Sequence, residues 1–278
     1  MDDSLVGFLQ NSSIEIIKIF MKQKIPKKIH YCWFGGNPLP DDAKKYIDSW
    51  RKYCPDYEII EWNESNFDLN SNTYIKEAYY AKKMAFVTDY VGLYVMYNIG
   101  GVYMDTDVEL LSNIDRFLEH DAFSGFESVE WIPTGIMASR KGLPLFKELL
   151  NYYNDRHFIK EDGSYDLTTN LVPITSICKK YGLELNNNYQ VIEGFALYPN
   201  DVFCPKSHET GKINITDNTV AIHHFAGSWL NSKEQSRRNL KRNLIEKYGD
   251  FWGGKILYTL CMPYRIVSVI SQRIEKYM

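Results

Sequence analysis

The sequence lacks any cysteine spacing that would hold a disulfide framework or a zinc ion. Its cysteines are few and odd in number, and no two of them form a C-x-x-C pair. This pattern predicts reduced thiols, as in cytosolic proteins, and argues against a disulfide-stapled or zinc-binding class. The five cysteines are Cys32, Cys54, Cys178, Cys204 and Cys261.

The sequence also lacks a long uncharged apolar run. A membrane-spanning helix needs about 18 or more consecutive apolar residues, and polar or charged residues interrupt every candidate stretch. The chain begins Met1-Asp2-Asp3, whereas a secretory signal begins with basic residues. We therefore expect a cytoplasmic protein with no spanning helix.

Composition is otherwise that of a folded globular protein. The 278 residues are 45% hydrophobic and 24% charged, which fits one large domain or one domain with an appendage. Aromatic residues reach 15%, including 21 tyrosines. Such side chains suit carbohydrate or nucleobase contacts, although a tyrosine-rich core would explain them equally well.

Strand and helix patterns alternate along the chain, which predicts an α/β sheet with crossover helices. Apolar runs predict strands over 29–34, 57–62, 102–104, 122–127, 136–139 and 220–225. Helical periodicity predicts helices over 4–21, 41–53, 81–98, 144–153 and 171–181. We expect Asp41 or Asp42 near the N-cap of the second helix, with Trp50 on its buried face.

Asp105 and Asp107 form the most informative motif. They follow the glycine pair Gly100-Gly101 and a short apolar strand, so they lie at the end of a sheet strand where α/β proteins bind ligands. Side chains two residues apart in a strand point to the same side, and two like charges placed so close favour a cation. A divalent metal ion that neutralises a departing phosphate explains the pair best.

Three further features accompany this pair. Asp89, within Phe86-Val87-Thr88-Asp89-Tyr90, is either a helix N-cap or a carboxylate for ligand hydroxyls. At most one of His223 and His224 can point into a shared site, because adjacent strand residues face opposite ways. Trp33 precedes Gly35-Gly36 and either stacks on a uracil-type ring or is buried in the core.

Together, in this order, these motifs resemble glycosyltransferase family 32, the DXD-containing sugar transferases that include yeast initiating mannosyltransferases and bacterial surface or capsular polysaccharide enzymes. The similarity lies in residues 26–36, in 85–107 and in 223–229, and it spans roughly residues 25 to 230. It implies a GT-A fold: a Rossmann-like, mixed central sheet flanked by helices, with a helical C-terminal extension. We expect an N-terminal helix over 1–24, the catalytic domain over 25–231 and a basic tail over 232–278.

The resemblance also implies roles for individual residues. Asp89, Asp105 and Asp107 would be the catalytic carboxylates. The metal ion, Mn²⁺ or Mg²⁺, would be held by Asp105, Asp107 and His224. The donor would contact Trp33 through its base, Asp89 and Asp105 through its sugar, Tyr103 near its ribose or diphosphate, and Ser228 and Trp229 over its diphosphate.

One position departs from the family pattern. The family often has an arginine three residues after the helix aspartate, and here that residue is Gly92. Arg140 and Lys141 are candidate replacements that the sequence does not rank. The alternatives are a different donor sugar or a catalytically weak paralogue.

The resemblance implies a retaining glycosyltransferase that moves a hexose (Gal, Glc or an N-acetyl form) from a UDP-sugar to a glycan. The expected acceptor is a lipid-linked surface polysaccharide intermediate, and no nucleic-acid partner is expected. Two other classes remain open. One is a metal-dependent phosphohydrolase or nucleotidyltransferase, which would need acidic ligands beyond Asp107, and the other is a non-catalytic nucleotide-sugar binding protein.

Charge is unevenly distributed along the chain. The net charge is −3, yet residues 228–278 carry ten Lys or Arg and four Asp or Glu. This basic tail, 233–278 in particular, predicts either peripheral binding to an anionic membrane on its inner face, or a helical cap or dimer contact.

Overall fold

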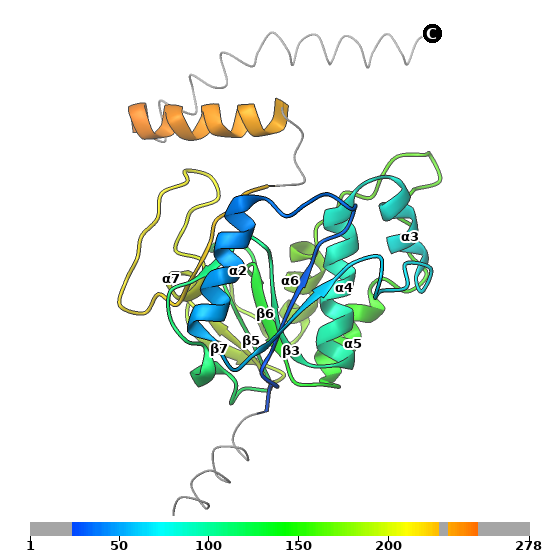
Figure 1. The fold of residues 1–278 in the computed structure, drawn as a ribbon, viewed down its shortest axis with the longest axis horizontal. Coiled ribbons are helices and arrows are strands. Elements are labelled where there is room, and N and C mark those ends of the chain that lie inside the picture. The colour runs from blue at the N-terminus through cyan, green and yellow to red at the C-terminus, as the bar shows by residue number, and fades with distance from the viewer. Residues whose placement is uncertain (1–23, 228–232, 250–278) are drawn as a thin grey trace, which may run out of the picture. The chain divides into compact units, whose positions relative to one another are not determined.

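A computed structural model describes residues 24–227 and 233–249 (Figure 1). The described chain divides into two compact units. The larger unit comprises residues up to Pro205 together with Asn214–His224. The smaller unit comprises Lys206–Ile213 and the residues from Phe225 onward, and its described helix covers 233–249.

The larger unit is built on a seven-stranded sheet with the order β2-β1-β3-β6-β5-β8-β7, next to a two-stranded sheet of β4 and β9. The strands are β1 (Lys28–Cys32), β2 (Glu58–Trp62), β3 (Gly101–Met104), β4 (Val108–Leu110), β5 (Ala122–Gly125), β6 (Ile136–Ser139), β7 (Gln190–Ile192), β8 (Phe195–Tyr198) and β9 (Ala221–His223). The helices are α2 (Asp41–Tyr53), α3 (Thr73–Tyr80), α4 (Met84–Asn98), α5 (Pro144–Asn151), α6 (Leu171–Lys180) and α7 (Asn200–Phe203), with a 3₁₀ turn at Asp115–Phe117.

The sheet is mixed, as the family resemblance implies. Strand β1 runs parallel to β2 and β3, whereas β6 is antiparallel to both β3 and β5. The carboxyl ends of β1, β2, β3 and β5 therefore meet at one edge of the sheet. We call this the carboxyl edge, and Asp105 lies on it directly after β3.

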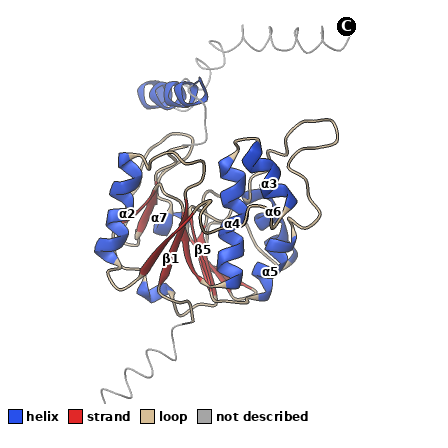
Figure 2. Ribbon diagram, turned by 45° about the vertical axis from the view of Figure 1, so that its right-hand side comes forward, coloured by secondary structure: helices blue, strands red, loops and turns tan. Residues whose placement is uncertain are grey.

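Helices cover both faces of the sheet, with α2 and α7 on one side and α3, α4, α5 and α6 on the other (Figure 2). Side chains alternate between the two cores along each strand. In β1, Tyr31 packs on the α2 side and Cys32 packs on the α4 side. In β3, Met104 packs on the α2 side and Tyr103 packs on the α4 side.

Helix α2 has the predicted bounds, and Trp50 is fully buried on its inner face, with its Nε1 donating to the Val108 carbonyl at 2.7 Å. Asp41 and Asp42 lie next to the N-cap, as expected, but neither is the cap residue itself. Pro40 occupies the N-cap position without a side-chain hydrogen bond, and Asp41 and Asp42 lie in the first turn. There they still interact favourably with the helix dipole.

The largest difference from the sequence prediction lies before α4. A separate helix, α3, covers Thr73–Tyr80, and the Asn72 side chain caps it by accepting from the Tyr74 N–H at 2.9 Å. Helix α4 then begins at Met84 instead of residue 81. Asp89 consequently lies inside α4, so its reading as an N-cap is wrong.

Four of the cysteines, at positions 32, 54, 178 and 204, are buried free thiols, in line with the sequence prediction, and Cys261 lies outside the described residues. Within 24–227 and 233–249, none of the helices is long and apolar enough to cross a bilayer. The helix predicted over 4–21 lies outside the described residues.

Candidate active site

Asp105 and Asp107 meet His223 at the carboxyl edge. Ligand atoms of these three residues all lie within 4.8 Å of one another. Nε2 of His223 is 3.4 Å from Oδ1 of Asp107 and 3.9 Å from Oδ2 of Asp105. Two carboxylates and an imidazole form an O,O,N donor set that accepts Mn²⁺ and related divalent ions.

Backbone pairing brings these residues together from distant parts of the chain. The amide of Asp105 donates to the Gly135 carbonyl at 2.8 Å, which holds the end of β3 beside β6. After a turn, β4 pairs with β9 so that Val108 lies opposite His223. The amide of His224 donates to the Asp107 carbonyl at 2.9 Å and extends this pairing by one residue.

His224, which the family resemblance implies as the metal ligand, lies elsewhere. Its Nε2 is 2.8 Å from Oε2 of Glu109, and its ring stacks on Tyr46 with centroids 4.4 Å apart. Adjacent strand residues point to opposite faces, so only one histidine can reach the aspartates. The structure brings His223 to that position, which corrects the sequence-based choice between the two.

Glu127 is a site residue that the sequence analysis missed. It follows β5 at the carboxyl edge, and its Oε2 is 3.6 Å from Nδ1 of His223. The signal was available in principle, because Glu127 closes a predicted strand. However, only the sheet order shows that β5 runs in the same direction as β3. We call Asp105, Asp107, Glu127 and His223 the carboxylate cluster.

The cluster concentrates negative charge in a partly enclosed place, where His223 is buried and Asp105 and Asp107 are partly exposed. Burial, with a smaller contribution from the neighbouring Asp107 and Glu127 charges, raises the pKa of Asp105 to about 7, although His223 opposes the shift. Burial also raises the pKa of Glu127. Burial would lower the pKa of His223, but Asp107 outweighs it and holds that pKa well above the usual range. A bound divalent cation would relieve this crowding.

Gly135 keeps the His223 ring closely confined. A Cβ atom at Gly135 would lie 3.0 Å from the His223 ring and 3.0 Å from the Val108 side chain. A larger residue at this point would force the imidazole or the Val108 side chain to shift by a few tenths of an ångström. The ring position is therefore set by packing as well as by charge.

Asp89 extends the acidic site on the α4 side. Its Oδ2 accepts a hydrogen bond from the Asn170 amide at 3.1 Å, just before α6 begins. Burial and the Asp105 charge raise the pKa of Asp89 to about 8. A partly exposed carboxylate in this position can accept hydrogen bonds from ligand hydroxyls.

Tyr103 lies between Asp105 and the core. Its ring also helps to explain why position 92 holds a glycine where the family often has an arginine. The Tyr103 hydroxyl lies near Asp105, where it acts to lower the pKa of that carboxyl, and the Tyr103 ring lies against α4 at Gly92. A Cβ at Gly92 would approach the Tyr103 ring to 3.2 Å, so an arginine there would require the ring to move. The two proposed substitutes, Arg140 and Lys141, follow β6 at the opposite edge of the sheet, and Arg140 pairs with Asp121 at 2.7 Å.

Trp33 directly follows β1 at the carboxyl edge. It is half-buried, packs against the α2-side core, and donates from Nε1 to the Asn37 carbonyl at 2.6 Å. One part of the indole thus remains accessible for stacking. Ser228 and Trp229 lie outside the described residues.

Comparison with known proteins agrees with this geometry. Residues 40–124 match the family described as "Glycosyltransferase sugar-binding region containing DXD motif". That range includes α2, α3, α4 and the Asp105–Asp107 pair.

Two curated proteins of Schizosaccharomyces pombe are similar to part of the chain. The chain is 26% identical to inositol phosphoceramide mannosyltransferase 3 over 138 residues, which is 45% of this chain and 36% of that protein. It is 26% identical to inositol phosphoceramide mannosyltransferase 1 over 153 residues, which is 50% of this chain and 46% of that protein. The matches thus span less than half the length of either relative.

Solved structures with some likeness include PaToxG Glycosyltransferase, with a TM-score of 0.41, 17% identity and coverage of 64% of this chain and 80% of that one. Another is a glycosyltransferase involved in glycosylation of the major capsid of PBCV-1, with a TM-score of 0.42, 11% identity and coverage of 77% and 100%.

Proposed function

We propose that this protein is a retaining glycosyltransferase that moves a hexose from a UDP-sugar to a glycan acceptor. The hexose would be Gal, Glc or an N-acetyl form of either. Our candidate acceptor is a lipid-linked surface polysaccharide intermediate. One observation carries the proposal. Two aspartates and a histidine converge at the end of β3, where the sequence also matches a DXD sugar-binding region. The curated relatives are named as mannosyltransferases, so GDP-mannose belongs in every donor test.

The roles proposed for the site residues follow their positions. Asp105, Asp107 and His223 would hold Mn²⁺ or Mg²⁺, which supplies Lewis-acid stabilisation of the leaving diphosphate. Trp33 would stack on the base from the α2 side. Asp89 would bind sugar hydroxyls from the α4 side, with Tyr103 fixing the orientation of Asp105.

The proposed reaction is a front-face displacement. The bond between the anomeric carbon and the phosphate oxygen breaks, and the acceptor oxygen bonds to the same face of that carbon. The acceptor proton passes to the departing phosphate oxygen, so no protein nucleophile is needed. Positioning and electrostatic stabilisation would then provide much of the acceleration.

Glu127 favours one rival class. A metal-dependent phosphohydrolase or nucleotidyltransferase needs acidic groups beyond Asp107, and Glu127 is a further carboxylate beside the aspartate pair. Glu127 faces Nδ1 of His223 and is not among the three grouped ligand residues. We therefore assign it an orienting role and retain the hydrolase as an outcome of the test.

The test is a panel of nucleotide sugars, UDP-Glc, UDP-Gal, their N-acetyl forms and GDP-mannose, each incubated with the protein and Mn²⁺. Release of UDP from one UDP-sugar, with the anomeric configuration retained in the product, is the expected result. Release of inorganic phosphate would indicate the hydrolase. Binding without release would indicate the non-catalytic protein, and release from GDP-mannose alone would overturn the UDP assignment.

Peripheral binding to an anionic membrane through 233–278 remains a separate proposal. In the described helix, Arg238 donates to the carbonyls of Phe225 and Ala226 at 2.9 and 2.6 Å. Arg242 donates to the His208 carbonyl at 3.0 Å. The guanidinium groups of Arg238 and Arg242 are thus used in hydrogen bonds within the smaller unit. Any membrane contact would therefore depend on other basic residues. Flotation with anionic liposomes, before and after deletion of 233–278, tests this, and equal flotation would contradict it.

A further inference from the structure

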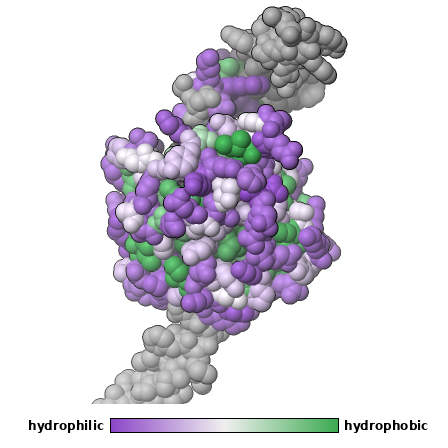
Figure 3. All heavy atoms as spheres, turned by 90° about the vertical axis from the view of Figure 1, so that its right-hand side faces the viewer, coloured by the Kyte–Doolittle hydropathy of each residue, from purple (hydrophilic) through white to green (hydrophobic). Residues whose placement is uncertain are grey.

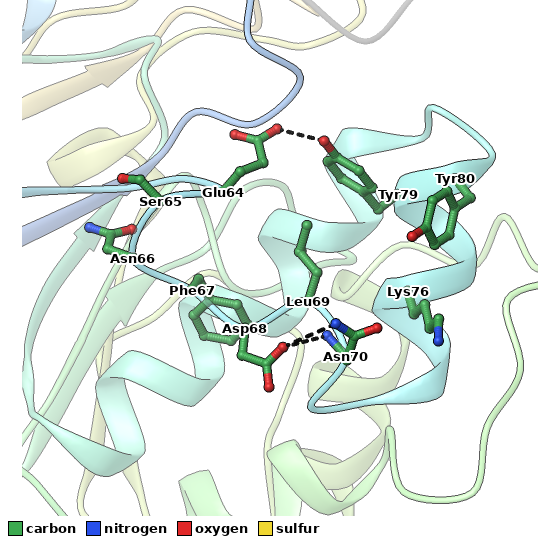
Figure 4. Close-up of a pocket in the computed structure, with 10 residues that line it drawn as sticks. All are labelled: Glu64, Ser65, Asn66, Phe67, Asp68, Leu69, Asn70, Lys76, Tyr79 and Tyr80. Atoms are coloured by element: carbon green, nitrogen blue, oxygen red, sulfur yellow. Dashed lines mark hydrogen bonds between the residues drawn. The ribbon is translucent and has the colours of Figure 1, made fainter.

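A pocket of about 500 Å³ lies beside the carboxyl edge of the sheet and has no role in the proposed donor site. The loop that follows β2 and one face of α3 form its walls (Figure 4). This volume is within the usual range for small-ligand sites. We call it the α3 pocket, and its lining residues are Glu64, Ser65, Asn66, Phe67, Asp68, Leu69, Asn70, Lys76, Tyr79 and Tyr80.

The pocket walls are firmly anchored. Phe67 is buried in the α4-side core, with its ring edge-on to Tyr94 at 5.2 Å. Oε1 of Glu64 accepts from the Gly35 amide at 2.6 Å and from the Tyr79 hydroxyl at 3.0 Å. Glu64 therefore joins the pocket loop both to α3 and to the loop that carries Trp33.

The pocket is on the side of the sheet where the donor sugar is expected. Phe67 packs in the α4-side core, as does Tyr103, which contacts Asp105. Trp33 packs on the α2 side. A donor that stacks its base on Trp33 would have its base on the α2 side of the sheet. With its sugar at Asp89, that sugar would lie on the α4 side, which is also the side of the pocket. Strand β2 lies two positions from β3, which is about 10 Å at the usual strand spacing.

The lining chemistry suits a carbohydrate. Tyr80 is 73% exposed and presents an aromatic surface at the rim, where a pyranose ring can stack. Asp68 and the neighbouring asparagines offer hydrogen-bonding groups for hydroxyls. In the part of the chain that the structure describes, no side-chain partner is seen for the Lys76 ammonium, which lies on the same wall (Figure 4).

The surroundings argue against other ligands. The face that carries α3 is mainly hydrophilic, with only scattered hydrophobic patches, so an apolar protein or lipid partner finds little to bind (Figure 3). The Glu64 and Asp68 carboxylates would repel a diphosphate. A polar, mostly uncharged ligand fits best.

We propose that the α3 pocket binds the acceptor glycan, with a sugar ring stacked on Tyr80 and its hydroxyls held by Asp68 and Lys76. This rests on the proposed transferase function, because the pocket would place an acceptor hydroxyl near the donor sugar.

Binding of an array of neutral and acidic oligosaccharides tests this without any turnover. We expect the wild-type protein to bind one class of glycan, and Tyr80→Ala to weaken that binding about tenfold or more, the effect of losing one aromatic stacking contact. Lys76→Ala should weaken it less. Tyr181→Ala, which removes a tyrosine that is 44% exposed just after α6, is the matched control and should bind as the wild type does.

Two results would overturn the proposal: no glycan binding by the wild-type protein, or equal binding by wild type and Tyr80→Ala. Nucleotide binding separates this failure from failure of the transferase proposal. Tyr80→Ala should keep the wild-type Kd for UDP in Mn²⁺ and the wild-type rate of acceptor-independent UDP release. A loss of UDP affinity in Tyr80→Ala would instead assign the pocket to the donor and contradict an acceptor role.

Discussion

The carboxylate cluster and the α3 pocket lie at the same edge of one sheet, yet they are built in opposite ways. The cluster is partly enclosed, because His223 is buried while Asp105 remains partly exposed. Its groups come from four separate strand ends, and its like charges lie close together. The pocket is open, comes from one loop and one helix, and is held by hydrogen bonds that are already satisfied. The first arrangement suits chemistry on a charged group, and the second suits recognition of a neutral, hydroxyl-rich one.

Removing a cluster carboxylate should have the largest effect. Asp107→Ala deletes a ligand group that faces His223 at 3.4 Å. We expect both turnover and Mn²⁺-dependent nucleotide binding to be lost, measured as UDP release and by titration with UDP. Asp68→Ala in the pocket is the comparison variant and should retain UDP binding. Turnover by Asp107→Ala with all metal chelated would contradict the role given to the cluster.

Replacing each histidine in turn should separate the two neighbours. His223→Ala removes the proposed nitrogen ligand and should weaken Mn²⁺ binding strongly, whereas His224→Ala disturbs contacts to Glu109 and Tyr46, away from the aspartates. Calorimetric titration of Mn²⁺ into both variants measures the difference. A larger loss in His224→Ala would return the ligand role to that residue.

Glu127→Gln should have an intermediate effect. Groups that orient a metal-binding histidine typically contribute about 10- to 100-fold in metal affinity. Glutamine keeps the size of the side chain but loses the charge facing Nδ1 of His223. Mn²⁺ affinity should fall within that range while the glycan-array profile stays unchanged. Unaltered Mn²⁺ affinity would mean that Glu127 only fills space.

The smallest effect concerns stability. Because the pKa of Asp89 is raised to about 8 in the folded protein, the folded state binds more protons than the unfolded state between about pH 4 and pH 8. Stability without ligands should therefore fall as pH rises through this window. Asp89→Asn should remove that loss and raise the free energy of unfolding at pH 8 by about 1 kcal/mol or more. Urea unfolding at pH 5 and pH 8 tests it, and parallel pH profiles for the two proteins would contradict it.

The sequence predicted the framework well where local pattern determines structure. Helix α2 and the strands β3 and β6 have the expected positions because periodicity and the glycine pair after α4 mark them clearly. Helix α3 was missed because it is only 8 residues long, so its buried positions Tyr74, Ile75 and Ala78 form too short a pattern to stand out.

The site was predictable only in part, because it depends on pairing between distant segments. Asp105 and Asp107 stand out as a local motif. Which histidine faces the aspartates depends on the register of β4 against β9. The position of Glu127 near His223 depends on the order of β3, β6 and β5 in the sheet. Neither register nor strand order can be read from short-range patterns.

The most direct test of the central claim is a crystal structure of the protein grown with Mn²⁺ and UDP, with the ion located by its anomalous scattering. We expect one ion coordinated by Asp105, Asp107 and Nε2 of His223, and by diphosphate oxygens of UDP. An ion held by His224 and Glu109, or UDP bound with no ion between it and the aspartates, would contradict it.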